Sequence, residues 1–109
     1  MTLPKIEPLR PTKSAHVPIG REWTYELKLD GFRGVLEIAE GDARFTSKNA
    51  KPMRRFQPLA LSLAQSLDVR DAILDGEILV MGEDGPDFNA LFFARRPPCY
   101  AAFDLLWLN

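Results

Sequence analysis

The segment from Glu26 to Arg33 constrains the fold of this chain more than any other part of it. Its polar and apolar residues alternate, which predicts a β-strand with one charged and one apolar face. Asp30-Gly31 then predicts a tight turn into a second strand. Lys28 stands between carboxylates on the first strand, and an arginine follows the turn, so one interpretation is a nucleophilic lysine. The alternative is a hairpin whose outer face is simply charged.

The rest of the chain predicts an α+β fold, built as an antiparallel sheet with short helices. Strands are expected at residues 22–29, 32–39, 43–47, 73–81 and 100–108, and helices at 58–67 and from the N-cap Asp87 to about Phe93. The first three strands follow one another through short turns, which predicts an antiparallel meander. Residues 1–21 contain four prolines and predict an extended arm, pinned at Leu3, Ile6 and Leu9, ahead of one domain at 22–109.

The composition excludes several classes of protein. A chain of 109 residues has room for one domain, and its single cysteine, Cys99, rules out an intrachain disulfide framework. The one histidine, His16, stands in the proline-rich arm and is predicted to be a surface residue rather than a catalytic one. No apolar run approaches the length of a membrane span, and no signal peptide begins the chain. We therefore expect a cytoplasmic protein with no membrane partner.

The net charge of −1 conceals two blocks of opposite sign. Residues 43–67 carry five basic and no acidic side chains, whereas residues 68–87 carry seven acidic side chains against Arg70 alone. Such blocks favour one surface for an anionic partner and another for a cation or metal. The alternative is that both blocks are ordinary solvated faces.

Two carboxylates, Asp75 and Glu77, lie on one face of the otherwise apolar strand predicted at 73–81. Because a carboxylate is costly to bury without a partner, we expect the two to line a wet pocket or to hold a cation. Gly76 between them indicates that something approaches the backbone closely. An edge strand with an acidic outer face is the alternative.

Three segments of the chain together resemble a known family. They are Lys28-x-Asp30-Gly31-x-Arg33, Asp75-Gly76-Glu77 and Phe103-Asp104-Leu105-Leu106, in that order. The arrangement resembles the ATP-dependent DNA ligases of the covalent nucleotidyltransferase superfamily, and most closely the bacterial end-joining type. Phe45 to Asn49 and Gly85 to Leu91 are similar to further elements of those ligases. The resemblance implies a partial ATP-grasp-like nucleotidyltransferase (adenylation) domain.

The resemblance also implies a role for each site residue, with ATP and Mg²⁺ (or Mn²⁺) as cofactors. Lys28 would be the catalytic residue that becomes adenylated. Glu26 would contact the adenine edge, Arg33 would contact the ribose and phosphates, and Phe103 would stack on the base. Glu77 would contact the ribose or the metal, while Asp30 and Asp75 would shape the site. Lys48 stands where the family usually has an arginine that contacts the nucleotide, and a lysine lacks the planar fork of that arginine.

The expected substrate is nicked or broken double-stranded DNA, sealed in repair or recombination. Lys48, Lys51, Arg54 and Arg55 are expected to contact its phosphate backbone. By resemblance, the chain is the N-terminal half of an adenylation domain, without the later motifs or the oligonucleotide-binding (OB-fold) domain. Catalysis by this chain alone would then be impaired, and a second polypeptide supplying the missing half is an expected partner.

The last strand should in that case expose Phe103, Leu106 and Trp107. Two other functions stay open at this point. One is a non-catalytic remnant or a nucleotide- or DNA-binding module from a truncated gene. The other is an RNA ligase or a capping-type nucleotidyltransferase.

Overall fold

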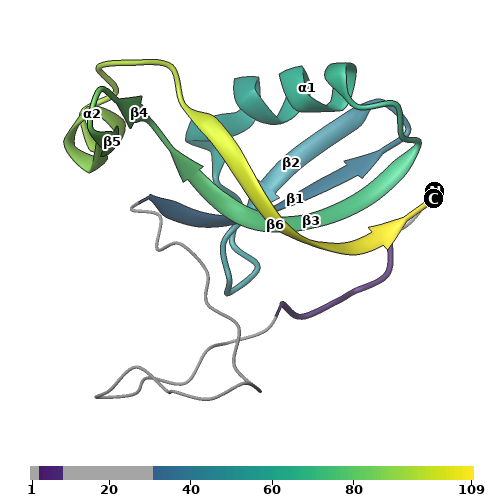
Figure 1. The fold of residues 1–109 in the computed structure, drawn as a ribbon. Helices are drawn as coiled ribbons and strands as arrows, with labels where there is room; N and C mark the ends of the chain where they lie inside the picture. The colour runs from purple at the N-terminus through teal and green to yellow at the C-terminus, as the bar shows by residue number, and fades with distance from the viewer. Residues whose placement is uncertain (1–2, 9–30) are drawn as a thin grey trace, which may run out of the picture.

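A computed structural model of the protein describes residues 3–8 and 31–109. Its framework is a four-stranded antiparallel sheet in the order β2-β1-β3-β6 (Figure 1). The strands are β1 (Phe32–Ala39), β2 (Asp42–Thr46), β3 (Asp71–Leu79) and β6 (Cys99–Leu108). The predicted antiparallel sheet with short helices is confirmed, and these strands begin and end within two residues of the predicted positions.

Helix α1 (Gln57–Ser66) lies across one face of the sheet and closes the hydrophobic core (Figure 1). It follows a 3₁₀ turn, η1 (Arg54–Phe56), and Pro58 stands in its first turn, where a missing N–H costs nothing. Alternate positions of the strands face this helix, as a period of two requires. The core side chains that are at most 1% exposed include Leu36, Ile38, Phe45, Ala60, Ala72 and Ile78.

The pairing of β1 corrects the predicted meander. β1 pairs with β2 from Val35 to Ala39 and with β3 along its whole length. β3 therefore occupies the side of β1 that a meander would give to the strand predicted at 22–29. Seven of the nine residues of β3 are buried, as expected for a strand with a neighbour on each side. Residues 22–29 themselves lie outside the described part of the chain.

A small second hairpin and a short helix stand at one end of the sheet (Figure 1). The hairpin comprises β4 (Met81–Gly82) and β5 (Gly85–Pro86), and helix α2 (Phe88–Phe92) follows it. The prediction of Asp87 as the N-cap of this helix is confirmed, because its side chain accepts a hydrogen bond from the Ala90 N–H at 3.0 Å.

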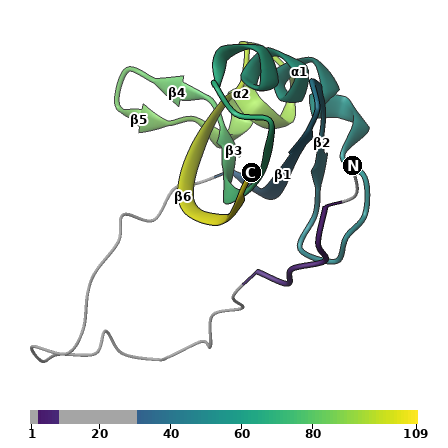
Figure 2. The same cartoon turned by 90° about the vertical axis from the view of Figure 1, so that its right-hand side faces the viewer.

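Residues 3–8 lie against the face of the sheet opposite α1 (Figure 2). Leu3 and Ile6 are half-buried, as expected for an arm pinned by its apolar side chains, whereas Leu9 lies outside the described residues. Within residues 3–8 and 31–109, no helix is long and apolar enough to cross a membrane.

Strand β6 forms one edge of the sheet and carries exposed apolar side chains. Phe103, Leu105, Trp107 and Leu108 are 41–52% exposed, so the predicted exposure of Phe103 and Trp107 is confirmed. The prediction for Leu106 is wrong, since this residue is half-buried. It is the unpaired residue of a β-bulge, and the bulge breaks the alternation of faces that the prediction assumed.

Candidate functional site

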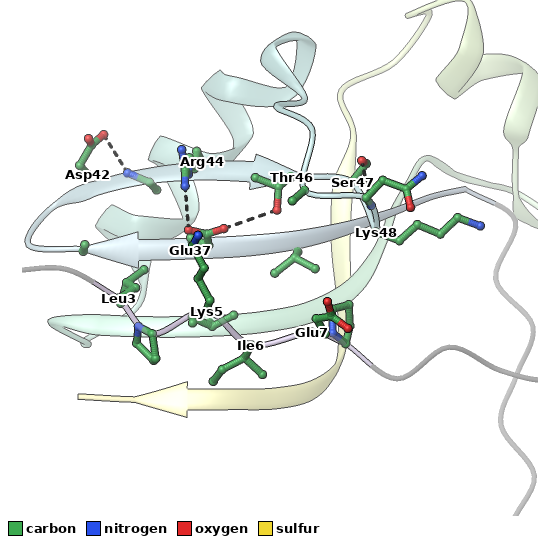
Figure 3. Close-up of a pocket in the computed structure, with 18 residues that line it drawn as sticks. Leu3, Lys5, Ile6, Glu7, Glu37, Asp42, Arg44, Thr46, Ser47 and Lys48 are labelled. Carbon is green, nitrogen blue, oxygen red and sulfur yellow. Dashed lines mark hydrogen bonds and ion pairs between the residues drawn. The ribbon is translucent and has the colours of Figure 1, made fainter.

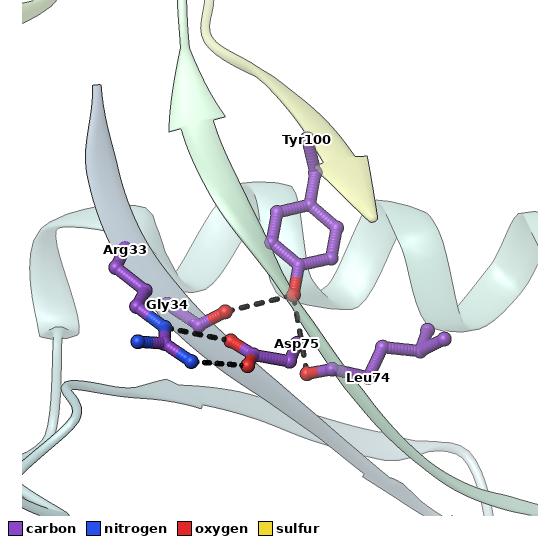
Figure 4. A network of polar contacts seen from close by, with 5 residues as sticks. All are labelled: Arg33, Gly34, Leu74, Asp75 and Tyr100. Carbon is purple, nitrogen blue, oxygen red and sulfur yellow. Dashed lines mark hydrogen bonds and ion pairs between the residues drawn. The ribbon is translucent and has the colours of Figure 1, made fainter. Parts of the chain in front are cut away.

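Arg33 and Asp75 form a two-pronged ion pair on the face of the sheet opposite α1 (Figure 4). Arg33 donates to the two carboxylate oxygens, from Nε at 3.1 Å and from Nη2 at 2.6 Å. The side chain of Asp75 is 2% exposed and that of Arg33 is 19% exposed. Two parallel hydrogen bonds fix the plane of the guanidinium as well as its position. Asp75 thus holds a cation, as the sequence predicts, and that cation comes from the chain itself.

Glu77 stands directly opposite Arg33 in the register of β1 and β3 and is half-buried. The pKa of Arg33 is raised above its ordinary value, first by the hydrogen bond that it donates to Asp75 and further by the charges of Asp75 and Glu77, while burial opposes the rise. The arginine therefore stays charged, and the sheet presents a fixed positive charge between two carboxylates.

Phe103 reaches this ion pair from the edge strand. The pairing of β6 with Asp75 and Gly76 skips Phe103, which makes Phe103 the extra residue of a second β-bulge. The Arg33 Cζ lies 5.8 Å from the centre of the Phe103 ring, and Phe103 is 47% exposed. The bulge therefore brings a cation and an aromatic ring together across β3 while much of the ring stays open to solvent.

Two glycines face each other in the strands that carry Arg33 and Asp75, and the ring of Tyr100 covers one of them, Gly76. Gly34 of β1 stands opposite Gly76 of β3. A Cβ atom on Gly76 would lie 2.8 Å from Tyr100 Cζ and 2.4 Å from the carbonyl oxygen of Ala101. The close approach that the sequence predicts at Gly76 is therefore made by strand β6 and its tyrosine.

The Tyr100 hydroxyl ties the two central strands together (Figure 4). It donates to the carbonyl oxygens of Gly34 at 2.7 Å and Leu74 at 3.1 Å, which adjoin Arg33 and Asp75 in the chain. Burial, followed by the charge of Asp75, raises the pKa of Tyr100 well above its ordinary value, so the phenol keeps its proton. No local sequence pattern marks Tyr100 as part of the site, because its place over Gly76 depends on the pairing of β3 with β6.

Three of the predicted site residues, Glu26, Lys28 and Asp30, lie outside the described part of the chain. The structure brings Arg33, Asp75, Glu77 and Phe103 together on three neighbouring strands. The β1–β2 pair nearest to Arg33 is Val35 with Thr46. Lys48 follows Thr46 by two residues, at the same end of β1 as Arg33. The roles of all these residues in binding remain predictions.

The predicted DNA-contacting residues Lys48, Lys51, Arg54 and Arg55 are all exposed. They occupy the loop and the 3₁₀ turn between β2 and α1. Arg55 is held in place there, because it donates to the carbonyl oxygen of Leu91 and its Cζ lies 5.0 Å from the centre of the Phe56 ring. The loop therefore presents its positive charge to solvent at a defined position.

A pocket of about 830 Å³ adjoins the site on the same face of the sheet (Figure 3). Residues 3–8 form one wall, and β1, β2 and the loop that begins at Ser47 form the others. Its floor carries Glu37, which accepts hydrogen bonds from Arg44 at 3.2 Å and from Thr46 at 3.5 Å. Lys48 also lines this pocket. No sequence pattern predicted the pocket.

Comparisons with known proteins identify the family of this chain. The profile of the ATP dependent DNA ligase domain family matches residues 7–109. DNA ligase C of Mycobacterium tuberculosis is 32% identical over 124 residues, an alignment that covers 100% of this chain and 34% of the ligase. The multifunctional non-homologous end joining protein LigD of Pseudomonas aeruginosa is 39% identical over 71 residues, which cover 64% of this chain and 8% of LigD.

Solved structures show the same similarity. The ligase domain of M. tuberculosis LigD superposes with a TM-score of 0.66 at 31% sequence identity, over 76% of this chain and 29% of that domain. A mycobacterial DNA ligase D complexed with ATP and MES superposes with a TM-score of 0.60 at 30% identity, over the same shares of 76% and 29%. The chain thus spans about a third or less of each of these relatives.

Proposed function

Because this chain belongs to the ATP-dependent DNA ligase domain family, we propose that it forms part of an adenylation site, in which Lys28 accepts AMP from ATP for the sealing of nicked or broken double-stranded DNA. In this proposal residues 22–109 are a partial adenylation domain, residues 1–21 are its leading arm, and the protein works in the cytoplasm. A structural relative complexed with ATP supports the choice of nucleotide.

The observation that carries the proposal is the cluster of Arg33, Asp75, Glu77 and Phe103. Its groups match the parts of a nucleotide: the Phe103 ring can stack on a base, the Glu77 carboxylate can accept from ribose hydroxyls, and Arg33 can face phosphate oxygens. Asp75 supports the cluster by fixing the guanidinium plane of Arg33.

In the proposed reaction the chain forms one covalent bond, from Lys28. The unprotonated Lys28 amine forms a bond to the α-phosphorus of ATP, the bond to the pyrophosphate oxygen breaks, and the nitrogen loses a proton to solvent. A fixed positive charge such as that of Arg33 favours the neutral amine and stabilises negative charge that develops on the phosphate oxygens. Asp75 acts through Arg33 and is a positioning residue.

The described residues offer a divalent metal ion only part of a coordination sphere. Glu77 is the carboxylate we propose for Mg²⁺ or Mn²⁺, and residues 3–8 and 31–109 contain no group of three or more His, Cys, Asp or Glu side chains that could hold a metal. Water and phosphate oxygens would complete the sphere, as is usual for Mg²⁺. When bound, the ion would neutralise charge on the phosphates.

The exposed basic loop supports DNA as the substrate. Lys48, Lys51, Arg54 and Arg55 are exposed cations that fit contacts to phosphates, which would be salt-dependent and independent of sequence. The same loop is the observation that favours the second candidate function, a nucleotide- or DNA-binding module without chemistry, because phosphate binding needs nothing from Lys28.

We also propose that further polypeptide covers strand β6, either more of a longer chain or a second protein that supplies the remaining part of the adenylation domain. The exposed edge and its apolar side chains support this, as a sheet edge of this kind is a template for pairing. Sedimentation velocity of the 109-residue chain with a polypeptide corresponding to the rest of a relative's adenylation domain tests it. A single heterodimer is expected, and two separate species would contradict the proposal.

Covalent labelling tests the proposed function. The chain is incubated with α-labelled ATP and Mg²⁺ and run on a denaturing gel, together with Lys28→Ala and with Lys51→Ala, a matched removal of an exposed lysine. Label on the wild-type chain and on Lys51→Ala, and none on Lys28→Ala, is expected. Label that survives in Lys28→Ala would contradict the role of Lys28. An unlabelled wild-type chain that still binds DNA would favour the binding module.

A further inference from the structure

A continuous series of aromatic rings runs from the core of the protein to its surface around helix α2. The ring centres of Phe56 and Phe32 are 6.1 Å apart, those of Phe32 and Phe88 5.5 Å, those of Phe88 and Phe92 6.1 Å, and those of Phe92 and Phe93 5.1 Å. Exposure rises along the series, from 5% at Phe56 to 41% at Phe88, 55% at Phe92 and 60% at Phe93. Each outer ring therefore packs against its neighbour in the series, and more than half of Phe92 and Phe93 is exposed to solvent.

The end of α2 is built to present these rings. Ala94 adopts a left-handed conformation with φ 53°, and the N–H groups of Ala94 and Arg95 donate to the carbonyls of Leu91 and Ala90 at 3.2 and 2.9 Å. This is the Schellman pattern that ends many helices, with alanine where glycine is usual. It turns the chain back, so that Arg95 Cζ lies 5.3 Å from the centre of the Phe93 ring.

Positive charge surrounds the rings on the side where the helix ends. Arg95 and Arg96 follow α2 and are both exposed. Arg55, from the basic loop, donates to the carbonyl oxygen of Leu91 within α2 and so joins that loop to the helix. The acidic residues Glu83, Asp84 and Asp87 precede the helix and line a hollow with Phe88 and Asn89, at its N-terminal end. Arg95 therefore lies beside one of the outer rings, and Arg55 is bound to the helix that carries them.

We propose that the outer rings of α2 form a stacking platform for unpaired nucleotides of a DNA strand, with the surrounding arginines contacting its phosphates. The platform is defined by Phe92, Phe93, Arg95, Arg96 and Arg55. It is separate from the Arg33–Phe103 cluster and takes from the proposed function only that DNA is the partner.

The chemistry of the platform selects this partner. Exposed aromatic faces interleaved with arginines bind single-stranded nucleic acid, because every base has a face to stack and every nucleotide brings a negative charge. In a duplex the bases are stacked on each other, so they leave few base faces on which such rings could stack. An apolar protein surface would bury the rings but would leave the arginines without partners. A frayed end or an overhang meets both requirements.

Fluorescence anisotropy with a labelled single-stranded oligonucleotide of about ten nucleotides tests the proposal, since strand-binding sites of this kind cover about 4–16 nucleotides. Phe93→Ala should weaken binding about fivefold to a hundredfold, as expected for the loss of one stacked base. Trp107→Ala, which removes another exposed aromatic side chain on β6, should leave binding within about twofold. Arg95→Gln should lower the slope of log affinity against log salt by about 0.7.

A 2-aminopurine placed in the strand reports stacking directly, and its emission should change on binding to the wild-type chain but not to Phe93→Ala. Thermal melting of each variant checks that it is folded, which is expected because Phe93 is 60% exposed. Three results would overturn the platform. The wild-type chain does not bind the strand, Phe93→Ala binds it as well as wild type does, or Phe93→Ala loses self-association of the protein and not strand binding.

The labelling of Lys28 and the binding of the single strand test different proposals. Strand binding that depends on Phe93 supports the platform whether or not Lys28 is labelled. Labelling of Lys28 without such strand binding overturns the platform and leaves the proposed function intact.

Discussion

Arg33 binds Asp75 diagonally across the β1–β3 ladder, although the residue directly opposite Asp75 is Val35 and the one opposite Arg33 is Glu77. Diagonal neighbours in a sheet lie within reach of a long side chain, and the arginine uses that reach to place its guanidinium over the buried carboxylate. The arrangement leaves Glu77 beside the ion pair, and it determines how the site should respond to substitution.

Asp75→Asn should destabilise the protein by about 3 kcal/mol, because it removes the buried carboxylate that binds the Arg33 guanidinium through two hydrogen bonds. Chemical denaturation followed by circular dichroism measures the change. Asp104→Asn is the matched control, since Asp104 stands opposite Asp75 on β6 but is exposed, and its effect should stay within about 0.5 kcal/mol. Equal effects of the two substitutions would show that the ion pair does not stabilise the fold.

Glycine substitutions should follow the order of the contacts that a new Cβ would meet. Gly76→Ala should cost at least about 2 kcal/mol, because the Cβ would lie 2.4 Å from a backbone oxygen that cannot move aside alone. Gly34→Ala should cost less, since its nearest contact, at 3.0 Å, is a side-chain methyl of Ile78. Gly82→Ala, with a nearest contact at 3.4 Å, serves as the control. Melting temperatures that rank the three differently would contradict the close approach of β6 to Gly76.

Alkaline pH should destabilise the protein through Tyr100. The pKa of this group is raised in the folded state above its ordinary value of 10.0, so its contribution to stability is complete below pH 10.0 and is lost as the pH rises above that value. Absorbance at 295 nm should show that Tyr100 releases its proton only as the fold is lost, and the difference between wild type and Tyr100→Phe isolates its signal from that of Tyr25. Ionisation near pH 10.0 with the fold intact would contradict the prediction.

Tyr100→Phe should also cost about 1 kcal/mol at neutral pH, the usual net value of a hydrogen bond, because the ring would still cover Gly76. Chemical denaturation at neutral pH measures this cost. A loss several times larger would indicate that the hydroxyl supports more of the sheet than the two carbonyls of Gly34 and Leu74.

Phe103→Ala should raise the KM for ATP in the labelling of Lys28 by about tenfold, as expected for the loss of a stacked base. Leu105→Ala is the matched control, since Leu105 lies on the same strand and is similarly exposed, at 52% against 47% for Phe103. A lower rate at saturating ATP with an unchanged KM would assign Phe103 a role other than binding the base.

Much of the secondary structure could be predicted from local sequence. The alternation in 32–39 and the N-cap Asp87 led to elements that the structure confirms, because both signals act over a few residues. The neighbours of β1 could not be predicted in this way, since short turns favour a meander whereas the burial of β3 favours a central strand. The order of the motifs indicated the family, which the comparisons confirm.

The sequence by itself determined which residue types are available to the site and the strands that carry them. The tertiary structure alone decided which of them meet: Arg33 and Asp75 are 42 residues apart, and Tyr100 and Gly34 are 66 apart. The ring of Phe103 meets Arg33 from a position where a bulge shifts the register of β6. Register depends on the packing of whole strands against the core, and a shift of the register by one residue would turn these side chains to the other face of the sheet.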